Sequence, residues 1–265
     1  MVEICYERIT VDSMITLTAL ARVSLNKAAV DSGFDIAEAE AGGWLRYRST
    51  SSPVRVALTV LDDRPVGALS LEGVLAELRL PDFHGINTPD GYAGCFGAAN
   101  FNDVQDILTR AYVLGRALPD ELYRSWQDAV AHVGPTERDA TVKQRIGQDY
   151  FRRGLLALWN ERCAITGLAV PELLRASHAK PWKDASDTER LDVYNGLLLA
   201  AHLDAAFDAG LICVAGDGSV EVSADLDSST RAILGLVDGL RVERLSPKHQ
   251  KYLDWHRRHV FVGPR

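Results

Sequence analysis

The chain has 265 residues, of which 47% are hydrophobic and 25% are charged, and its net charge at pH 7 is −7. This length and composition fit one large folded domain or two modest ones. No stretch of about 18 uncharged apolar residues occurs, so we expect no membrane-spanning helix and no membrane partner.

The cysteines Cys5, Cys95, Cys163 and Cys213 lie far apart, and none forms a C-x-x-C pair. This spacing argues against a disulfide framework, and we expect no structural zinc site. The first residues, "MVEICYERITVDSM", lack the basic segment and the apolar run of a secretory signal. We therefore predict a protein of the reducing cytoplasm.

The negative net charge hides a gradient along the chain. Residues 1–140 carry 20 acidic and 12 basic residues, whereas residues 141–175 carry 3 acidic and 6 basic ones. Residues 241–265 carry 2 acidic and 7 basic residues and three histidines. Local basic patches matter more than the total charge when the partner is a polyanion, although a solvated surface explains any single patch equally well.

The first hundred residues predict mixed helices and strands. Residues 14–34 have apolar positions at helical spacing, and residues 42–49 and 53–63 have the pattern of strands. Residues 69–81 predict a short amphipathic helix. Residues 84–101 are rich in glycine without the spacing of a phosphate-binding loop, and we expect them to form an irregular connection.

Residues 102–133 predict two helices separated by a break near Pro119, the first of them capped by Asn102 or Asp103. Residues 134–146 have few large apolar side chains and are the best candidate for a linker. We therefore expect an α+β protein of two domains, with an amino-terminal α+β recognition domain at residues 1–140 and a second domain at residues 141–265.

Residues 142–168 begin the second domain with a predicted helix. Its apolar stripe consists of Ile146, Tyr150, Phe151, Leu155, Leu158 and Trp159. Arg145, Arg152 and Arg153 lie outside that stripe and are candidates for contacts with nucleic acid.

The segment "LLRASHAKPW" places His178 before a Lys-Pro-Trp turn. A lone histidine is more often part of a core than of a site, but Asn195 follows in a turn that leads into an apolar strand. The short helical segment "HLDAAFDAG" comes next. Its Asp204 and Asp208 are four residues apart, so both carboxylates lie on one helix face. Two oxygen donors near an imidazole suit Mg²⁺ or Mn²⁺.

This order of residues resembles the HNH endonucleases, which contain a ββα-metal motif. The resemblance is closest to a restriction-endonuclease-like subgroup with the patterns SH-x-KPW, NGLLL and LD-x-x-FD-x-G. These patterns correspond here to "SHAKPW" at residues 177–182, "NGLLL" at residues 195–199 and "LDAAFDAG" at residues 203–210. The preceding "RCAITG", residues 162–167, would be the first strand of the hairpin.

The resemblance implies a role for each residue. His178 would be the general base that takes a proton from the attacking water, and Asn195, the second catalytic residue, would hold His178 in orientation. Asp204 and Asp208 would bind one divalent cation, Mg²⁺ or Mn²⁺, and the activity would be metal-dependent hydrolysis of DNA.

Two departures from the commonest family pattern affect the metal site. The residue before the general base is often an aspartate or histidine ligand, but here it is Ser177, a weak ligand. Asp204 occupies the position of the family's last histidine, and His202 lies two residues earlier. His202 is therefore an alternative contact for the metal or the phosphate.

Further basic residues are candidates for nucleic-acid contacts. Lys180 and Lys183 flank the "KPW" turn, where they would touch phosphate or be merely solvated. Arg46 and Arg48 alternate with Trp44 and Tyr47 in "WLRYRS", so they would either contact DNA beside stacking aromatics or lie on an exposed strand face with Trp44 in the core. Arg110 and Arg116 belong to the predicted helix after residue 102.

The sequence thus predicts an endonuclease for double-stranded DNA, of the kind found in restriction enzymes, whose substrate can be modified DNA. One alternative is a non-catalytic nucleic-acid-binding protein with a degenerate HNH domain, and Ser177 permits it. Another is a nonspecific nuclease effector in which residues 1–140 act as a sensor. The oligomeric state stays open, with a homodimer as one option.

Overall fold

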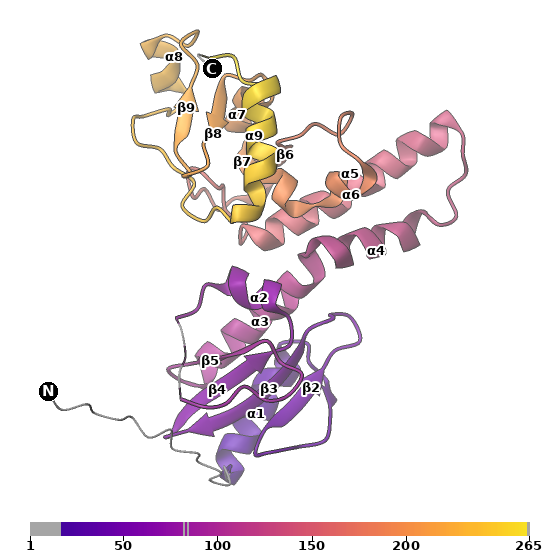
Figure 1. Cartoon of the computed structure of the whole chain (residues 1–265), viewed down its shortest axis with the longest axis vertical. Coiled ribbons are helices and arrows are strands. Elements are labelled where there is room, and N and C mark those ends of the chain that lie inside the picture. The colour runs from indigo at the N-terminus through magenta and orange to yellow at the C-terminus, as the bar shows by residue number, and fades with distance from the viewer. Residues whose placement is uncertain (1–16, 82, 84, 264–265) are drawn as a thin grey trace, which may run out of the picture. The chain divides into compact units, whose positions relative to one another are not determined.

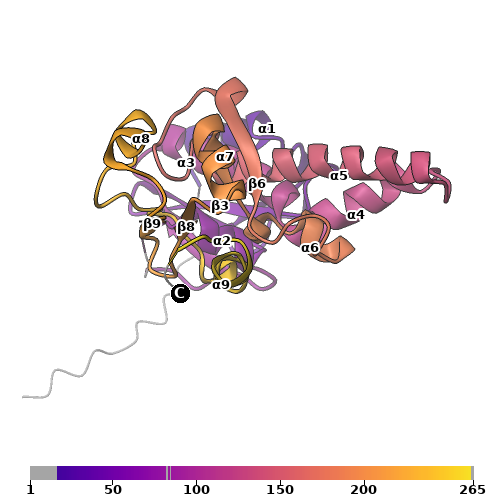
Figure 2. The same ribbon diagram turned by 90° about the horizontal axis from the view of Figure 1, so that it is seen from above.

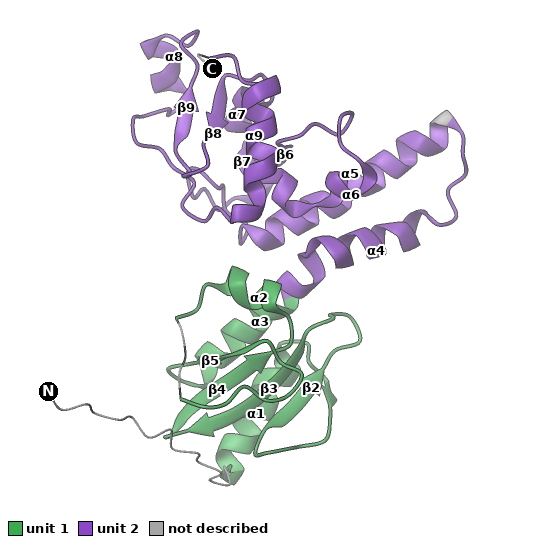
Figure 3. Cartoon of the chain, in the orientation of Figure 1, with its two compact units in different colours: residues 1–112 green, residues 113–265 purple. Residues whose placement is uncertain are grey.

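The structure is a computed structural model that describes residues 17–81, 83 and 85–263. The segment that lacks a secretory signal, and Cys5 within it, lie outside these described residues. The chain divides into two compact units, Met1–Tyr112 and Val113–Arg265 (Figure 3). Among the described residues, no helix has both the length and the apolarity needed to cross a membrane.

Unit 1 is built around a five-stranded antiparallel sheet in the order β1-β2-β3-β4-β5 (Figure 1). The strands are β1 Ile36–Ala37, β2 Leu45–Arg48, β3 Arg55–Leu61, β4 Arg64–Leu69 and β5 Gly94–Gly97. Asp62 and Asp63 connect β3 to β4 with positive φ angles of 48° and 62°. A two-residue hairpin turn of this kind matches the twist of the strands, and aspartate tolerates the left-handed conformation.

Helices and a loop supply the core of unit 1. The helices are α1 Ala19–Asp31, α2 Glu72–Leu78 and α3 Phe101–Ala117, whose last residues belong to unit 2. The Thr18 hydroxyl caps α1 by accepting a hydrogen bond from the backbone N–H of Ala21. A cluster of Trp44, Ala57, Val66 and Ala68 packs with Phe83, Ile86 and Tyr92 of the following loop.

The expected helices at residues 14–34, 69–81 and 102–133 and the strands at residues 42–49 and 53–63 are confirmed within the described residues. Two expectations were wrong. The glycine-rich segment contains strand β5, whose Gly94 and Gly97 leave room for the side chains of Leu75 and Phe83. The helix after residue 100 begins at Phe101, because the Asn100 side chain accepts hydrogen bonds from the N–H groups of Asn102 and Asp103.

Unit 2 begins with two helices and continues into short strands. Its elements are α4 Pro119–Val130, α5 Glu137–Leu158, η1 Pro171–Leu173, β6 Leu174–His178, α6 Asp187–Leu191, η2 Val193–Asn195, β7 Gly196–Ala200, α7 Ala201–Asp208, β8 Ile212–Val214, β9 Val220–Val222, α8 Ser228–Ile233, η3 Pro247–His249 and α9 Gln250–His259. Helices α4 and α5 lie side by side, as both views show (Figure 2).

The predicted linker at residues 134–146 is largely helical. A capping box starts α5: the Thr136 hydroxyl accepts from the Asp139 N–H, and the Asp139 carboxylate accepts from the Thr136 N–H. The predicted domain boundary near residue 140 falls inside α5, whereas the two compact units meet between Tyr112 and Val113. The division into functional domains therefore stays a prediction.

The apolar stripe of α5 packs against the β6–β7 hairpin. Phe151, Leu155, Leu158 and Trp159 are buried, and every residue of β7 is buried as well. The segment "RCAITG" is a turn and not a hairpin strand, so that expectation was wrong. The turn is closed by the Cys163 thiol, whose sulfur accepts hydrogen bonds from the N–H groups of Thr166 and Ala200.

Candidate active site

Two strands and a helix follow one another around the histidine motif "SHAKPW". Strands β6 and β7 are antiparallel, with His178 opposite Gly196, and α7 begins directly after β7. A Cβ atom at Gly196 would lie 2.4 Å from Cζ of Phe151 and 2.6 Å from the Ser177 carbonyl oxygen. Position 196 therefore requires glycine, because only glycine lets the Phe151 ring approach the strand so closely.

His178 lies at the end of β6 between two aromatic rings. Its imidazole stacks on Phe151 at a centroid distance of 3.7 Å and meets the edge of Trp182 at 5.8 Å. Nε2 lies 2.9 Å from the carbonyl oxygen of Arg190. Since a carbonyl oxygen only accepts, Nε2 carries the proton in the neutral ring and Nδ1 keeps the lone pair. Burial lowers the pKa of His178 to about 4.

Asn195 ends the η2 turn and is fully buried, with 0% of its surface exposed. Its Oδ1 accepts a hydrogen bond from the Lys180 N–H at 2.8 Å. Its Nδ2 donates to the carbonyl oxygens of Lys180 at 3.1 Å and Glu189 at 2.9 Å. Asn195 thus ties the chain after His178 to the residue before Arg190, without touching the imidazole itself.

Helix α7 carries the pair of acidic residues. Asp204 accepts a hydrogen bond from the hydroxyl of Ser177, which connects the helix to the strand residue next to His178. Partial burial, and then the nearby charge of Asp204, raise the pKa of Asp208 to about 6. The exposed His202 is two residues from Asp204 and therefore points away from the Asp204–Asp208 face.

The acidic pair fits a hard divalent cation. Two carboxylates that repel each other are relieved by a bound positive charge, and the Ser177 hydroxyl adds a third oxygen beside them. Within the described part of the chain, no cluster of three or more His, Cys, Asp or Glu side chains could hold a metal. One or two carboxylates are the usual protein share of a Mg²⁺ site, whose other ligands are waters and substrate phosphates.

The predicted basic contacts of unit 2 differ in their surroundings. Arg152 donates to the carbonyl oxygens of Leu174 and Pro171, both at 2.7 Å, so it holds the start of β6 against α5. Lys180 forms an ion pair with Glu189 at 2.7 Å. The side chains of Arg145, Arg153 and Lys183 are exposed.

The predicted contacts on β2 involve partners within unit 1. Trp44 and Tyr47 are buried, so neither ring is open for base stacking, as the alternative with Trp44 in the core anticipates. Arg46 lies over the Tyr92 ring at 5.7 Å, and Arg48 pairs with Glu38 at 3.6 Å. On α3, Arg116 is exposed and Arg110 is partly buried.

Sequence patterns did not identify two contributors to the site. Phe151 was expected only as a member of an apolar stripe, yet its ring carries the imidazole of His178. Arg190 contributes a backbone carbonyl, which leaves no signal in a sequence. Among the three histidines of residues 241–265, His256 is buried and donates from Nε2 to the Phe207 carbonyl oxygen at 3.0 Å.

Comparisons with known proteins agree with this geometry. Residues 163–215 match a family model described as HNH endonuclease, and the match covers β6, β7 and α7. A search of curated proteins found no match to the chain. HNH nucleases act on nucleic acid and generally use a divalent metal ion. The β6–β7–α7 segment of unit 2 is therefore a domain of the HNH endonuclease family.

Proposed function

We propose that this chain is a metal-dependent DNA endonuclease that hydrolyses phosphodiester bonds. One observation carries the proposal. His178 is held as the tautomer with a free Nδ1 lone pair, and the adjacent Ser177 is hydrogen-bonded to Asp204 of the acidic pair on α7. The candidate base thus follows directly, along β6, the residue that is bonded to the acidic pair.

In this reaction, Nδ1 of His178 removes a proton from a water molecule while the water oxygen forms a bond to phosphorus. The bond from phosphorus to the 3′ oxygen breaks, and the departing oxygen takes a proton from solvent. Because the pKa of His178 is about 4, the imidazole is neutral at pH 7 and its Nδ1 lone pair is unprotonated. Asn195 acts through the backbone to keep the ring in place.

Asp204 and Asp208 are the residues that would hold a single divalent cation, Mg²⁺ or Mn²⁺. Such an ion, when bound, stabilises negative charge on the phosphorus centre and on the departing oxygen. His202 does not share their helix face, so we assign it no ligand role.

Double-stranded DNA is the proposed substrate, and its phosphates would meet the exposed side chains of Arg145, Arg153 and Lys183. We assign selection of the substrate, including modified DNA, to the amino-terminal part of a cytoplasmic restriction enzyme. Unit 1 offers a pocket of about 430 Å³ lined by charged side chains, among them Arg22, Glu38, Glu40 and Arg46. A mixture of both charges suits selective recognition better than a general clamp on DNA.

The test is cleavage of supercoiled plasmids, unmodified and carrying different modifications in one sequence, with Mg²⁺, Mn²⁺ or EDTA. Wild type should cleave at least one plasmid in a metal-dependent manner, and His178→Ala should lose that cleavage. His202→Ala is the matched control, since it removes an exposed imidazole from the opposite side of α7 and should retain activity.

Equal inertness of wild type and His178→Ala on every plasmid would favour a degenerate HNH domain in a binding protein. Equal cleavage of all plasmids would favour the nonspecific effector with a sensor domain. Loss of activity in His202→Ala, with cleavage retained in Asp204→Asn, would move the metal ligand from Asp204 to His202.

A further inference from the structure

The orientation of His178 depends on one backbone group, the carbonyl of Arg190. That residue belongs to α6, a helix of five residues that is too short to be stable by itself. The interactions that hold α6 beside β6 therefore also decide where the carbonyl lies. They fix which nitrogen of His178 carries the proton.

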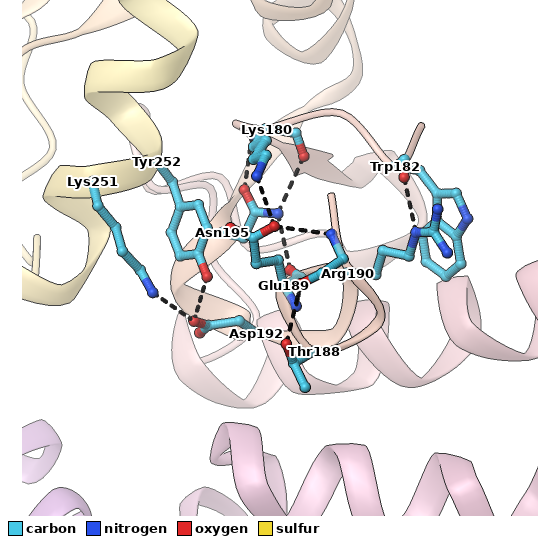
Figure 4. A network of polar contacts seen from close by, with 10 residues as sticks. Lys180, Trp182, Thr188, Glu189, Arg190, Asp192, Asn195, Lys251 and Tyr252 are labelled. Carbon is cyan, nitrogen blue, oxygen red and sulfur yellow. Dashed lines mark hydrogen bonds and ion pairs between the residues drawn. The ribbon is translucent and has the colours of Figure 1, made fainter. Parts of the chain in front are cut away.

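Glu189 is the residue of α6 with the most bonds to its surroundings. Its Oε2 accepts from the Lys180 ammonium at 2.7 Å and from the Ser186 N–H at 2.9 Å, the second bond being half of a capping box (Figure 4). Burial alone would raise the pKa of Glu189, but the hydrogen bonds from Lys180 and Ser186 and the lysine charge lower it overall. Glu189 is therefore held as a carboxylate.

Lys180 stands two residues after His178, and its side chain reaches across to α6. The Lys180 and Glu189 side chains are 19% and 29% exposed, so water screens this ion pair less than more exposed pairs such as Lys27–Asp31. The backbone of Lys180 is held as well, by both ends of the Asn195 amide. Lys180 is thus linked to α6 twice, by the ion pair of its side chain and, through the Asn195 amide, by its backbone.

A third tie comes from the side chain of Arg190. Its Nε donates to the Trp182 carbonyl oxygen at 2.8 Å, and its guanidinium lies over the Trp182 ring at 5.2 Å. Trp182 in turn touches His178 with its ring edge. The side chain of Arg190, bonded to the Trp182 carbonyl (Figure 4), therefore helps to hold the Arg190 carbonyl that accepts the hydrogen bond from Nε2 of His178.

From this arrangement we infer that Lys180 and Glu189 are positioning residues for His178: their ion pair anchors α6 so that the Arg190 carbonyl selects the Nε2–H tautomer and leaves Nδ1 free. This inference rests on the proposed function, because the tautomer matters when His178 acts as a base. It gives Lys180 a role other than the phosphate contact predicted from sequence, which its engagement with Glu189 disfavours.

The experiment measures the tautomer of His178 directly, by ¹⁵N NMR of histidine-labelled full-length protein at neutral pH, with the His178 signals assigned by their loss in His178→Gln. Wild type should show only the Nε2–H tautomer. Lys180→Met and Glu189→Gln should show a mixture of both tautomers. Lys180→Arg, which keeps the ion pair, should resemble wild type.

Cleavage of plasmid provides the second readout. Loss of a group that orients a catalytic residue typically costs about 10- to 100-fold in activity, and we expect this loss in kcat and not in KM for both Lys180→Met and Glu189→Gln. The double variant should lose little more than either single variant, because both break the same ion pair. Glu221→Gln on β9 is the matched control, since it breaks the 2.8 Å ion pair between Glu221 and Arg257 of α9.

A pure Nε2–H tautomer in Lys180→Met and Glu189→Gln would overturn the inference, and a rise in KM without change in kcat for Lys180→Met would make Lys180 a phosphate ligand. If Lys180→Met does not fold, Glu189→Gln, which can still accept the capping hydrogen bond of Ser186, decides the question. The tautomer is read without substrate, so a chain inert on all DNA would refute the proposed function while leaving this inference open to its own measurement.

Discussion

His178 and His256 occupy nearly the same local environment in two different regions of unit 2. Each imidazole stacks on a phenylalanine, His178 on Phe151 at 3.7 Å and His256 on Phe207 at 3.8 Å. Each donates from Nε2 to a backbone carbonyl, and burial lowers the pKa of each to about 4. Stacking, tautomer and pKa therefore do not distinguish a reactive histidine from a structural one.

The second ring nitrogen makes the difference. His256 is 1% exposed, and its Nδ1 is buried without a hydrogen-bond partner among the described residues. His178 is partly exposed and follows Ser177, which contacts the acidic pair of α7. The comparison teaches that a base is recognised by what its free lone pair can reach and not by how its ring is held.

The largest expected effect concerns cleavage. His178→Ala should lower the cleavage rate by about 10²- to 10⁴-fold, the usual contribution of a general base. His256→Phe keeps an aromatic ring on Phe207 and should leave the rate within a few-fold of wild type. Plasmid nicking under identical metal conditions measures both, and a similar loss in the two variants would break the comparison.

Low pH should reveal the effect of the lowered pKa of the two histidines on the free energy of unfolding. A histidine with a pKa of 6.5 when unfolded and about 4 when folded binds its proton more readily in the unfolded chain. The free energy of unfolding should therefore fall as pH drops from about 6.5 to 4, by about 1.4 kcal/mol per pH unit for each histidine.

Urea unfolding at pH 7 and pH 5, followed by spectroscopic signals from unit 2, measures this loss. His256→Phe should remove about half of the loss that the two histidines cause. An unchanged slope in that variant would mean that His256 titrates normally in the folded chain.

Two neighbouring arginines of α5, Arg152 and Arg153, allow a test of structural and DNA-binding roles near His178. Arg152→Ala should destabilise the chain by about 1–3 kcal/mol, because the carbonyl oxygens of Leu174 and Pro171 lose charged donors next to β6. Arg153→Ala removes an exposed cation that lies over the Tyr150 ring at 4.1 Å, so it should lower the free energy of unfolding by no more than about 0.5–1 kcal/mol. It should reduce the salt dependence of DNA binding by about one phosphate contact. Denaturant unfolding and binding isotherms at several salt concentrations separate the two roles.

The smallest effect concerns Asp208. Its raised pKa means that the folded chain binds this proton more tightly than the unfolded chain, so ionisation destabilises the fold as pH rises through about 4 to 6. Asp208→Asn should therefore melt at a slightly higher temperature than wild type at pH 7. Mg²⁺ or Mn²⁺ should raise the melting temperature of wild type but not of the variant. A variant that melts lower and still responds to metal would exclude Asp208 as a ligand.

The sequence predicted the α+β class, the apolar strand after Asn195 and the short helix that follows it, because the periodicity of these segments is local. The first strand of the hairpin was expected at residues 162–167 but lies at Leu174–His178. Strand β5 escaped prediction, since a glycine-rich edge strand is recognised only from the strand beside it. The cap of α3 was displaced to Asn100, because several polar residues near a helix start can compete for the same role.

Within the site, the predicted polar side chains belong to recognisable motifs. The groups that hold those side chains in place do not belong to any motif. The Arg190 carbonyl is a group that every residue possesses, and the Phe151 ring is indistinguishable from other core aromatics until the hairpin packs on it. Arg152 and Arg153 look alike in the sequence, yet one binds backbone and the other faces solvent.

The Asn195–Gly196 step has a consequence for the chemical durability of the protein. Asparagine followed by glycine deamidates readily, because a glycine nitrogen without a neighbouring Cβ attacks the side-chain amide with little hindrance. In the folded chain, that amide is buried and donates to the carbonyls of Lys180 and Glu189. An aspartate formed there would present an acceptor to two acceptors. Unfolding therefore exposes Asn195 to deamidation. A chain with aspartate at position 195 loses the two hydrogen bonds that hold the loop after His178.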